Sequence, residues 1–172
     1  MKKNLLIAGA LVAVLLISGS LIFLSDTTTK TTVVLNYLND NLDAGGIRLG
    51  MPDHEVMELL GSGAYLHGFG GYVREYPDMG LLVSIPTDPD HDLCGGISHL
   101  EFHNPAYSIF GIRVGDDMRG AMSILKANRF HPSDHSPDTV LLGEFSIKLR
   151  GQDRIDAIQI WFDDKDLKDR LY

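Results

Sequence analysis

The stretch GIRLG at residues 46–50 decides the fold, because GIRVG at residues 111–115 repeats it 65 positions later. Four of the five residues are identical. Two further pairs, Met57/Met122 and Leu60/Leu125, continue the match without a gap. Self-similarity at a fixed spacing is typical of a duplicated structural unit. The sequence therefore predicts a tandem repeat.

Each predicted repeat places a short helix after its second glycine. In the first copy Pro52 fits the first helical turn, Asp53 and Glu55 put negative charge at the positive end of the helix, and Gly61 ends it. In the second copy Asp117 is the expected N-cap and Asn128 the terminator. Another helix is expected from residue 33 onward, where apolar residues recur at helical spacing until Gly45.

Strands are expected after each of these short helices, over residues 71–76, 81–85, 97–103, 140–149 and 155–162, where β-rich or alternating patterns occur. The repeat extends into them, since Ile97, Leu100 and Phe102 align with Ile155, Ile158 and Ile160 at an offset of 58. The predicted fold class is α+β. It consists of two tandem repeats, residues 33–104 and 105–172, each a helical pair packed on an antiparallel sheet.

The N-terminus predicts a membrane segment. Residues 5–24 contain no charged residue, and about 20 helical residues cross the hydrocarbon core of a bilayer. Lys2 and Lys3 precede this run, and basic residues favour the cytoplasmic side. We expect residues 1–24 to be a single-pass signal-anchor, residues 25–32 to be a linker, and the remaining chain to lie outside the cytoplasm.

A cleaved signal peptide is the alternative, since Ser18-Gly19-Ser20 offers small residues of the kind that a signal peptidase accepts. The protein would then be secreted. Against cleavage, the apolar run continues to Leu24, beyond the usual length of a signal-peptide core. The absence of a cysteine at the end of the run excludes a lipoprotein.

Composition limits the classes of partner. The net charge is −8 and Lys and Arg form no cluster longer than a pair, so binding to nucleic acid is disfavoured. The single cysteine, Cys94, excludes an intramolecular disulfide. The fold must therefore be stabilised by packing alone.

The phrase at residues 46–51, followed by apolar residues at 56 and 59–60 and by strands ending in an Ile-x-x-Leu-x-Phe pattern, resembles a known superfamily. It contains the secreted β-lactamase inhibitor protein and the small outer-membrane lipoprotein of the barrel-assembly machinery. The resemblance covers residues 33–163 and implies helices packed on an antiparallel sheet and binding of other proteins without catalysis. This chain departs from the pattern at Pro52 and Gly120, and it has neither a lipid-bearing cysteine nor domain disulfides.

The loop from Asp88 to Cys94 is the main candidate for chemistry. Asp88, Asp90 and Asp92 alternate as at the start of a calcium loop, but the glycine and the final glutamate of such a loop are missing. A solvated acidic turn explains the pattern as well. Cys94 lies near His91 and His99, so a metal-dependent or thiol enzyme centred on this loop is the alternative function.

Other histidines give weaker candidates for a metal site. His99 and His103 share a predicted strand face but stand about 13 Å apart, at about 3.3 Å per residue, which is too far for both to bind one ion. His131 and His135 lie in a segment rich in Pro, Ser and Asp, which a turn explains. We expect no cofactor and assign no catalytic residue.

The leading hypothesis is a membrane-anchored, extracytoplasmic, non-catalytic module that binds a protein partner, with an inhibitory, immunity or envelope-assembly role. Alternation places Trp161 on the face of the last strand opposite Ile158, Ile160 and Phe162, so Trp161 is the expected contact residue. The alternative is that residues 165–172 fold back over it. Arg48 and Arg113, the polar residues that both copies share, are further binding candidates.

Overall fold

The computed structural model describes residues 30–68 and 70–164. The chain divides into a unit of residues Met1–Val33 and a compact unit of residues Val34–Tyr172, and the latter contains the fold described below. No helix within the described residues is long and apolar enough to span a membrane. The predicted membrane segment, residues 5–24, lies outside the described residues.

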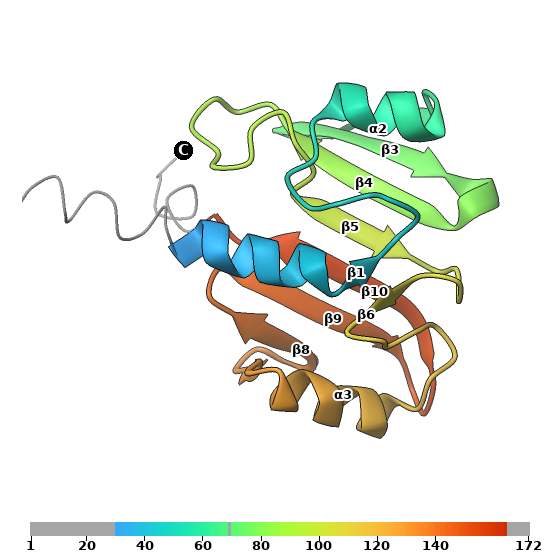
Figure 1. Cartoon of the computed structure of the whole chain (residues 1–172), viewed down its shortest axis with the longest axis vertical. Helices are drawn as coiled ribbons and strands as arrows, with labels where there is room; N and C mark the ends of the chain where they lie inside the picture. Colours follow the sequence, from blue (N-terminus) through green and yellow to red (C-terminus); the bar gives the residue numbers. More distant parts are fainter. Residues whose placement is uncertain (1–29, 69, 165–172) are drawn as a thin grey trace, which may run out of the picture. The chain divides into compact units, whose positions relative to one another are not determined.

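An eight-stranded antiparallel sheet forms the centre of the fold, in the order β2-β3-β4-β5-β10-β9-β8-β7 (Figure 1). Its strands are, in this order, Ala64–Gly68, Gly71–Tyr76, Leu81–Pro86, His99–Phe102, Ile155–Phe162, Phe145–Gly151, Ser136–Leu142 and His131–Ser133. A second, two-stranded sheet pairs β1 (Leu42–Asp43) with β6 (Ser108–Ile109), and a 3-10 helix, η1, spans Pro77–Met79. The predicted α+β class is confirmed.

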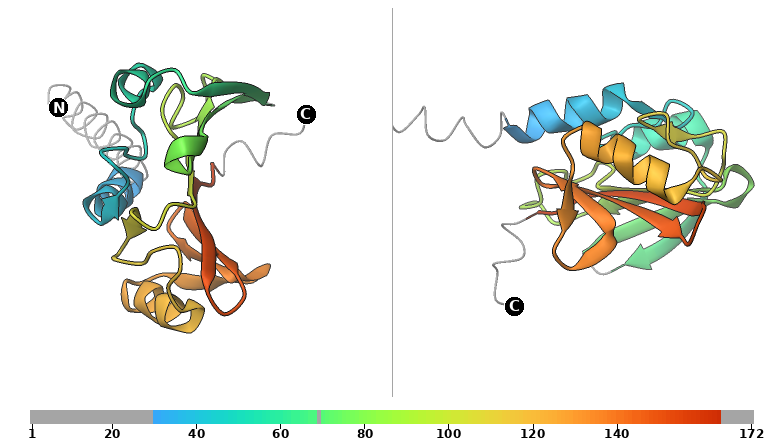
Figure 2. Two further views of the ribbon diagram at one scale, coloured as in Figure 1. Left: turned by 90° about the vertical axis from the view of Figure 1, so that its right-hand side faces the viewer. Right: turned by 90° about the horizontal axis from the view of Figure 1, so that it is seen from below.

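The α-helices of the described residues lie on one face of this sheet (Figures 1 and 2). The first helix, drawn in blue, includes residues 30–40 and therefore takes in residues 30–32, which the sequence analysis assigned to a linker. The others are α2 (Asp53–Leu60) and α3 (Met118–Ala127). Asp117 caps α3 as expected, because its side chain accepts a hydrogen bond from the Gly120 backbone N–H at 2.8 Å.

The core lies between the helices and the sheet. Strand residues that alternate toward the helices are fully buried there, among them Leu100, Ile147 and Ile160. Leu38 of the first helix and Leu125 of α3 meet them in the same cluster. This alternation is why the strands form where they do: period-two apolar residues can bury one face of a sheet and leave the other for polar groups.

The repeated glycines occupy equivalent turns. Gly50 and Gly115 both have positive φ, +76° and +95°, a region that side chains with a Cβ rarely adopt. The Gly50 N–H donates to the Ile97 carbonyl at 2.8 Å, and the Gly115 N–H donates to the Ile155 carbonyl at 2.7 Å. The first bond joins the turn before α2 to the segment that leads into β5. The second joins the turn before α3 to the start of β10.

The first helix is bonded to both halves of the fold. Tyr37 Oη donates to Asn128 Oδ1 at 2.9 Å, at the end of α3. The Asn39 amide exchanges two hydrogen bonds with the backbone of Leu49, at 3.0 and 2.9 Å, ahead of α2. These bonds fix the helix across the junction between the two halves.

Several predicted elements need correction. The sheet is continuous, since β5 pairs directly with β10, so the two predicted repeats do not form separate helix-plus-sheet units. The second half also contains one helix, α3, where a helical pair was expected, because Asn104-Pro105 and strand β6 occupy the segment before it. The predicted strand 140–149 is two strands, β8 and β9, separated by a turn in which Gly143 has φ +61°.

Candidate binding face of the sheet

The face of the sheet opposite the helices is the candidate functional site. In both views of Figure 2, no α-helix of the described residues lies on this face. Strand register places one row of side chains across it from β2 to β9: Leu66, Val73, Ser84, His99, Trp161 and Ser146. The neighbouring row is Ala64, Glu75, Leu82, Glu101, Gln159 and Lys148. The two rows combine polar, aliphatic and aromatic side chains, and Ser146 at the end of the first row is fully buried.

Glu101 of β5 is the central carboxylate of this face. Its Oε2 accepts a hydrogen bond from Gln159 Nε2 on β10 at 2.7 Å. Its Oε1 lies 2.9 Å from His103 Nε2 and 3.3 Å from an Arg150 guanidinium nitrogen on β9. Three strands thus contribute one side chain each, and a fourth comes from just beyond β5. We call Glu101, His103, Arg150 and Gln159 the Glu101 cluster.

The Glu101 cluster keeps its carboxylate charged. Burial of Glu101, whose side chain is 11% exposed, favours the protonated form. The hydrogen bond from Gln159 and the Coulomb interactions with His103, His99 and Arg150 act in the opposite direction and together lower the pKa of Glu101 below its usual value. The carboxylate therefore stays ionised and holds its neighbours in place at neutral pH.

His99 and Trp161 form a ring pair beside this cluster. They are cross-strand neighbours on β5 and β10, with ring centroids 6.4 Å apart and planes at 84°. The Ser84 hydroxyl lies 3.3 Å from His99 Nδ1. Burial lowers the pKa of His99 below its usual value, against the opposing charge of Glu101. Trp161 is half-buried and lies on the predicted face of β10. Residues 165–172, which the alternative prediction folds over it, lie outside the described residues.

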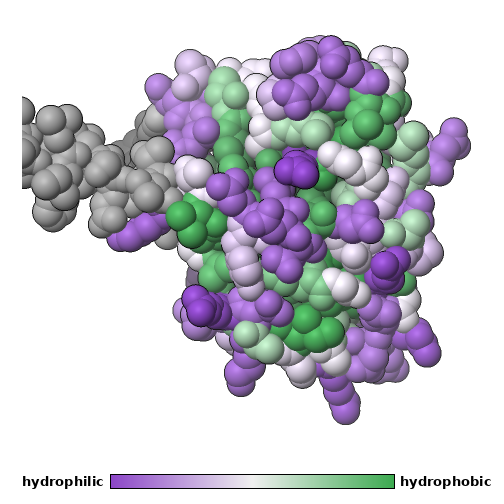
Figure 3. All heavy atoms as spheres, in the orientation of Figure 1, coloured by the Kyte–Doolittle hydropathy of each residue, from purple (hydrophilic) through white to green (hydrophobic). Residues whose placement is uncertain are grey.

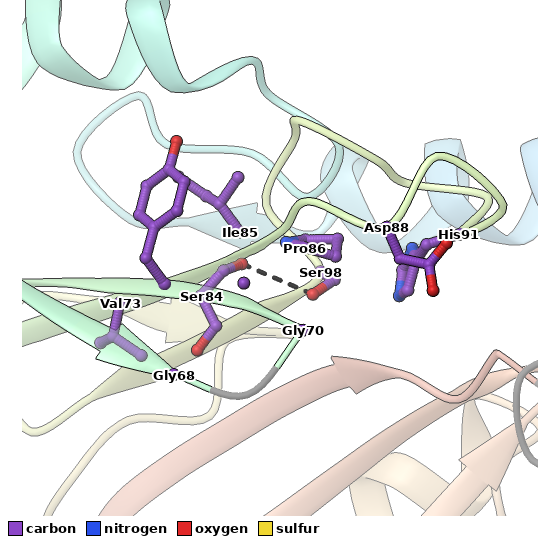
Figure 4. Close-up of a pocket in the computed structure, with 11 residues that line it drawn as sticks. Gly68, Gly70, Val73, Ser84, Ile85, Pro86, Asp88, His91 and Ser98 are labelled. Carbon is purple, nitrogen blue, oxygen red and sulfur yellow. Dashed lines mark hydrogen bonds between the residues drawn. The ribbon is translucent and has the colours of Figure 1, made fainter. Parts of the chain in front are cut away.

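Two cavities border the face. One, of about 360 Å³, has Val73 and Ser84 at one end and Asp88 and His91 of the following loop at the other (Figure 4). Between them the Ser98 hydroxyl donates to the Ser84 carbonyl at 3.5 Å, the dashed line of Figure 4. The other cavity, of about 310 Å³, has Glu75, Leu82 and His103 among its lining residues. One cavity therefore lies beside the row that contains Ser84, and the other lies beside the row that contains Leu82.

The loop after β4 contains the acidic residues that the sequence singled out. Asp88 Oδ1 accepts the Asp90 backbone N–H at 3.0 Å, and the Asp92 backbone N–H donates to Asp164 at 3.2 Å. Among residues 30–68 and 70–164, no three His, Cys, Asp or Glu side chains gather as a metal site would require. Asp88 adopts an Asx turn instead.

Cys94 of this loop is an exposed free cysteine. Its backbone N–H donates to the His91 carbonyl at 2.9 Å, and the His91 ring meets the edge of Phe162 with centroids 5.7 Å apart. Burial lowers the pKa of His91, against the opposing charges of Asp164, Asp92 and Asp88. The loop is thus held by its backbone and by packing on β10.

The other predicted site residues lie apart from the face. Arg48 is exposed in the connection between β1 and α2. Arg113 is exposed between β6 and α3, where its guanidinium donates to the carbonyls of Pro105 and Ala106 at 3.2 Å each. His131 begins β7, at one edge of the sheet, and His135 lies in the turn that follows. The structure brings none of these into the Glu101 cluster.

The helix-bearing side carries a different polar group. Arg74 of β3, which is buried, donates two hydrogen bonds to the Asp53 carboxylate at the start of α2, at 2.6 and 2.7 Å. The Tyr65 and Tyr72 rings lie beside its guanidinium, with centroids 5.6 and 5.5 Å away. The hydrogen bond from Arg74 lowers the pKa of Asp53, against burial, while burial and the Asp53 carboxylate raise that of Tyr72 to about 12.

This ion pair joins α2 to the sheet and leaves no free charge for a ligand. Figure 3 looks on to the helix-bearing side, where hydrophobic residues form separate patches among hydrophilic ones.

Sequence reasoning placed Trp161 on this face of the sheet but did not predict the Glu101 cluster. Gln159 and Arg150 are 58 and 49 residues from Glu101, so no local motif links them. One signal was present: the offset of 58 that aligns the closing strands also aligns Glu101 with Gln159. Two aligned polar residues among apolar ones would have pointed to this position.

Comparisons with known proteins give one structural relationship. No protein-family model matches the chain, and no curated protein matches it. The chain is similar to a solved structure, an extracellular protein containing an SCP domain from Bacillus anthracis str. Ames, with a TM-score of 0.53 and 9% sequence identity. The match covers 72% of this chain and 47% of that one, so this chain spans about half of that protein's length.

This comparison corrects the resemblance to the superfamily of the β-lactamase inhibitor protein and the barrel-assembly lipoprotein. The phrase that suggested it consists mainly of turn glycines and buried apolar residues. Gly46 and Gly50 both have positive φ, and Ile47 and Leu49 between them are in the core. Any chain that makes this turn ahead of a helix needs such residues, so the phrase is not specific to that superfamily. At 9% identity, the likeness to the SCP-domain protein shows the fold alone.

Proposed function

We propose that this chain is a membrane-anchored, extracytoplasmic module that binds a protein partner through the helix-free face of its sheet. The observation that carries the proposal is the half-buried Trp161, set beside His99 and next to the Glu101 cluster on that face. Tryptophan and arginine are enriched where proteins bind one another, and they supply most of the binding energy there.

The Glu101 cluster supports this role because it is already satisfied. Glu101 is bonded to Gln159 and paired with Arg150 and His103 in the free chain. A partner can therefore cover the cluster without leaving a buried charge unpaired, which would be costly. The strands hold these side chains in place, so little conformational entropy is lost on binding.

The two cavities that border the face make it better suited to a protein partner than a flat surface would be. Side chains that project from a partner can enter beside Ser84 at one border and beside His103 at the other. The proposed role is binding without catalysis. Its proposed purpose is inhibition, immunity or envelope assembly.

Location outside the cytoplasm has two supports. Residues 5–24 have the length and composition of a membrane anchor with Lys2 and Lys3 on its cytoplasmic flank. The structurally similar protein from Bacillus anthracis is described as extracellular. We place residues 25–172 on the outer side of the membrane.

We infer also that the two halves of the sheet come from one duplicated unit. The equivalent turn bonds of Gly50 and Gly115 support this inference. So does the strand order, which runs β2-β3-β4-β5 in one half and β7-β8-β9-β10 in the other, with β5 against β10. Glu101 and Gln159, which align in the sequence, face each other at this junction.

Photo-crosslinking in the intact cell tests the binding proposal. A photoreactive phenylalanine analogue at Trp161 of the full chain should give a crosslink to one defined protein. The matched control is the same analogue at Ile124, a 41% exposed residue of α3 on the helix-bearing side. Crosslinks from position 161 alone support the proposal. Equal crosslinks from both positions, or none from 161, overturn it.

A further inference from the structure

The two edges of the eight-stranded sheet differ in how they are protected. At one edge, β7 has only three residues and Pro132 at its centre, a residue that cannot donate to a neighbouring strand. At the other edge, all five residues of β2 are exposed, and its sequence Ala-Tyr-Leu-His-Gly contains neither proline nor a carboxylate, lysine or arginine. Natural edge strands usually carry such residues to prevent pairing with another chain.

The register of β2 shows which backbone groups remain available. Gly68 and Gly71 close the two-residue turn to β3, so they form a hydrogen-bonded pair, and the alternation continues through Leu66 and Ala64. Pro86 of β4 is consistent with this register, because its cross-strand partner is Gly71. The backbone N–H and C=O of Gly71 point toward β2, so Gly71 needs no N–H donor from position 86. Tyr65 and His67 therefore direct their N–H and C=O groups outward from the sheet.

Within residues 30–68 and 70–164 no strand pairs with the outer edge of β2, and this edge is complementary to itself. In an antiparallel pair centred on Leu66, Tyr65 of one copy faces His67 of the other, and the two residues exchange both backbone hydrogen bonds. Both side chains lie on the same side of the sheet. Within one copy the Tyr65 and His67 rings already meet edge to face with centroids 5.0 Å apart, so this geometry suits the pair.

The side chain on the opposite side of β2 is also compatible with this pairing. Leu66, which is 48% exposed, faces Leu66 of the other copy on the two-fold axis. No formal charges of the two β2 strands face one another while His67 is neutral, since the only ionisable side chains there are Tyr65 and His67. The net charge of −8 on each copy opposes the approach, so added salt favours it.

We propose that two copies of this chain associate through antiparallel pairing of their β2 strands, centred on Leu66. The result is a sixteen-stranded sheet in which the helix-free faces of both copies are continuous. A pair of five-residue strands buries less than the ~1,200 Å² of a stable interface, so the dimer is weak and forms at high local concentration. This proposal is independent of the partner-binding role.

Disulfide crosslinking of the full chain tests the pairing. In a Cys94→Ser background, Leu66→Cys places two thiols on the two-fold axis, at a non-hydrogen-bonded pair whose Cα atoms are about 4.5 Å apart. Mild oxidation should yield a disulfide-linked dimer, several-fold faster than for Leu59→Cys. Leu59 is a matched control, because it is 50% exposed but lies on α2. High salt should raise the yield of the Leu66→Cys dimer.

A second control lies on β2 itself. Ala64→Cys is exposed, but the proposed register separates its two copies by four residues, about 13 Å, which a disulfide cannot bridge. Slow crosslinking at position 64 supports the register. Equal rates at positions 59, 64 and 66 indicate random collision and overturn the proposal, as does a faster rate at position 64.

Two edge variants complete the test in the Leu66→Cys chain. His67→Pro removes an outward N–H without touching the bonds to β3, and Tyr65→Lys adds a charge to the edge without restricting the backbone. Each should slow crosslinking several-fold while the far-ultraviolet circular dichroism stays that of the parent. If both variants fold and crosslink at the parent rate, strand pairing is refuted.

Discussion

Gln159 on β10 donates a 2.7 Å hydrogen bond to Glu101, its direct cross-strand partner on β5, at the junction between the two halves of the sheet. The bond to an ionised carboxylate, in a position that is mostly shielded from water, is of the stronger kind. The same carboxylate accepts from Arg150 on β9, so one side chain connects three strands. Stability of the junction should depend on it.

We expect Glu101→Ala to lower the free energy of unfolding by about 2–3 kcal/mol, because it leaves Arg150 and Gln159 without their acceptor. Urea denaturation followed by circular dichroism measures this. Glu58→Ala, an exposed change on α2, is the control and should stay within about 0.5 kcal/mol of the parent. Equal small effects of both changes would show that the cluster contributes nothing to stability.

The Arg74–Asp53 pair should be more sensitive. Arg74→Ala leaves the Asp53 carboxylate without its partner at the start of α2, and we expect a loss of about 3–5 kcal/mol. Arg74→Lys keeps the charge but loses the two-pronged contact, so its loss should be intermediate. Thermal unfolding of both variants, beside Arg119→Ala on the exposed surface of α3, gives the comparison. A Lys variant as stable as the parent would contradict the importance of the bidentate geometry.

Stability should fall on the acid side of neutrality. Burial lowers the pKa of His99 from its usual 6.5, so below pH 6.5 the unfolded chain binds a proton that the folded chain does not. The free energy of unfolding therefore decreases as the pH falls below 6.5, until folded His99 protonates as well. At lower pH, Asp53 and Glu101, whose pKa values are also lowered, add a further loss.

Urea midpoints measured from pH 7.5 to 4.5 test this dependence. His91, whose pKa burial also lowers, contributes a loss of the same sign, so His99→Gln should reduce the slope of the profile below pH 6.5 without removing it, while the acid part persists. His135→Gln, at an exposed turn, is the matched control and should retain the full profile. If His99→Gln leaves the profile unchanged, the loss of stability just below pH 6.5 comes from another group.

The proposed N-terminal anchor leads to a prediction for the full chain in cells. Because residues 5–24 are long enough to cross a bilayer, the chain should stay in the membrane fraction after alkaline carbonate extraction. Protease added on the outer side of the cell membrane should degrade residues 34–172. A shorter product that begins after Ser20 and leaves the membrane fraction would indicate a cleaved signal peptide.

The sequence predicted the strands with strong local patterns and missed those without one. The expected bounds of β3 and β10, residues 71–76 and 155–162, agree with the structure, because their side chains alternate between core and surface. β2 was missed because all five of its residues are exposed and the strand has no buried side to produce alternation. Its presence depends on pairing with β3, which composition does not reveal.

The candidate site divides in the same way. Alternation within β10 was enough to place Trp161 opposite the core residues Ile160 and Phe162. The Glu101 cluster depends instead on which strands are neighbours, and the sequence did not predict the pairing of β5 with β10. Only the direct pairing of β5 with β10 brings Glu101, Gln159 and Arg150 together.

The bonds of the first helix have a mechanical consequence. Tyr37 connects this helix to the end of α3, and Asn39 connects it to the backbone ahead of α2. A pulling force applied through the N-terminal end of the chain would thus enter both halves of the fold at the same moment. In a single-molecule pulling experiment the body should rupture in one step, without an intermediate in which one half remains intact.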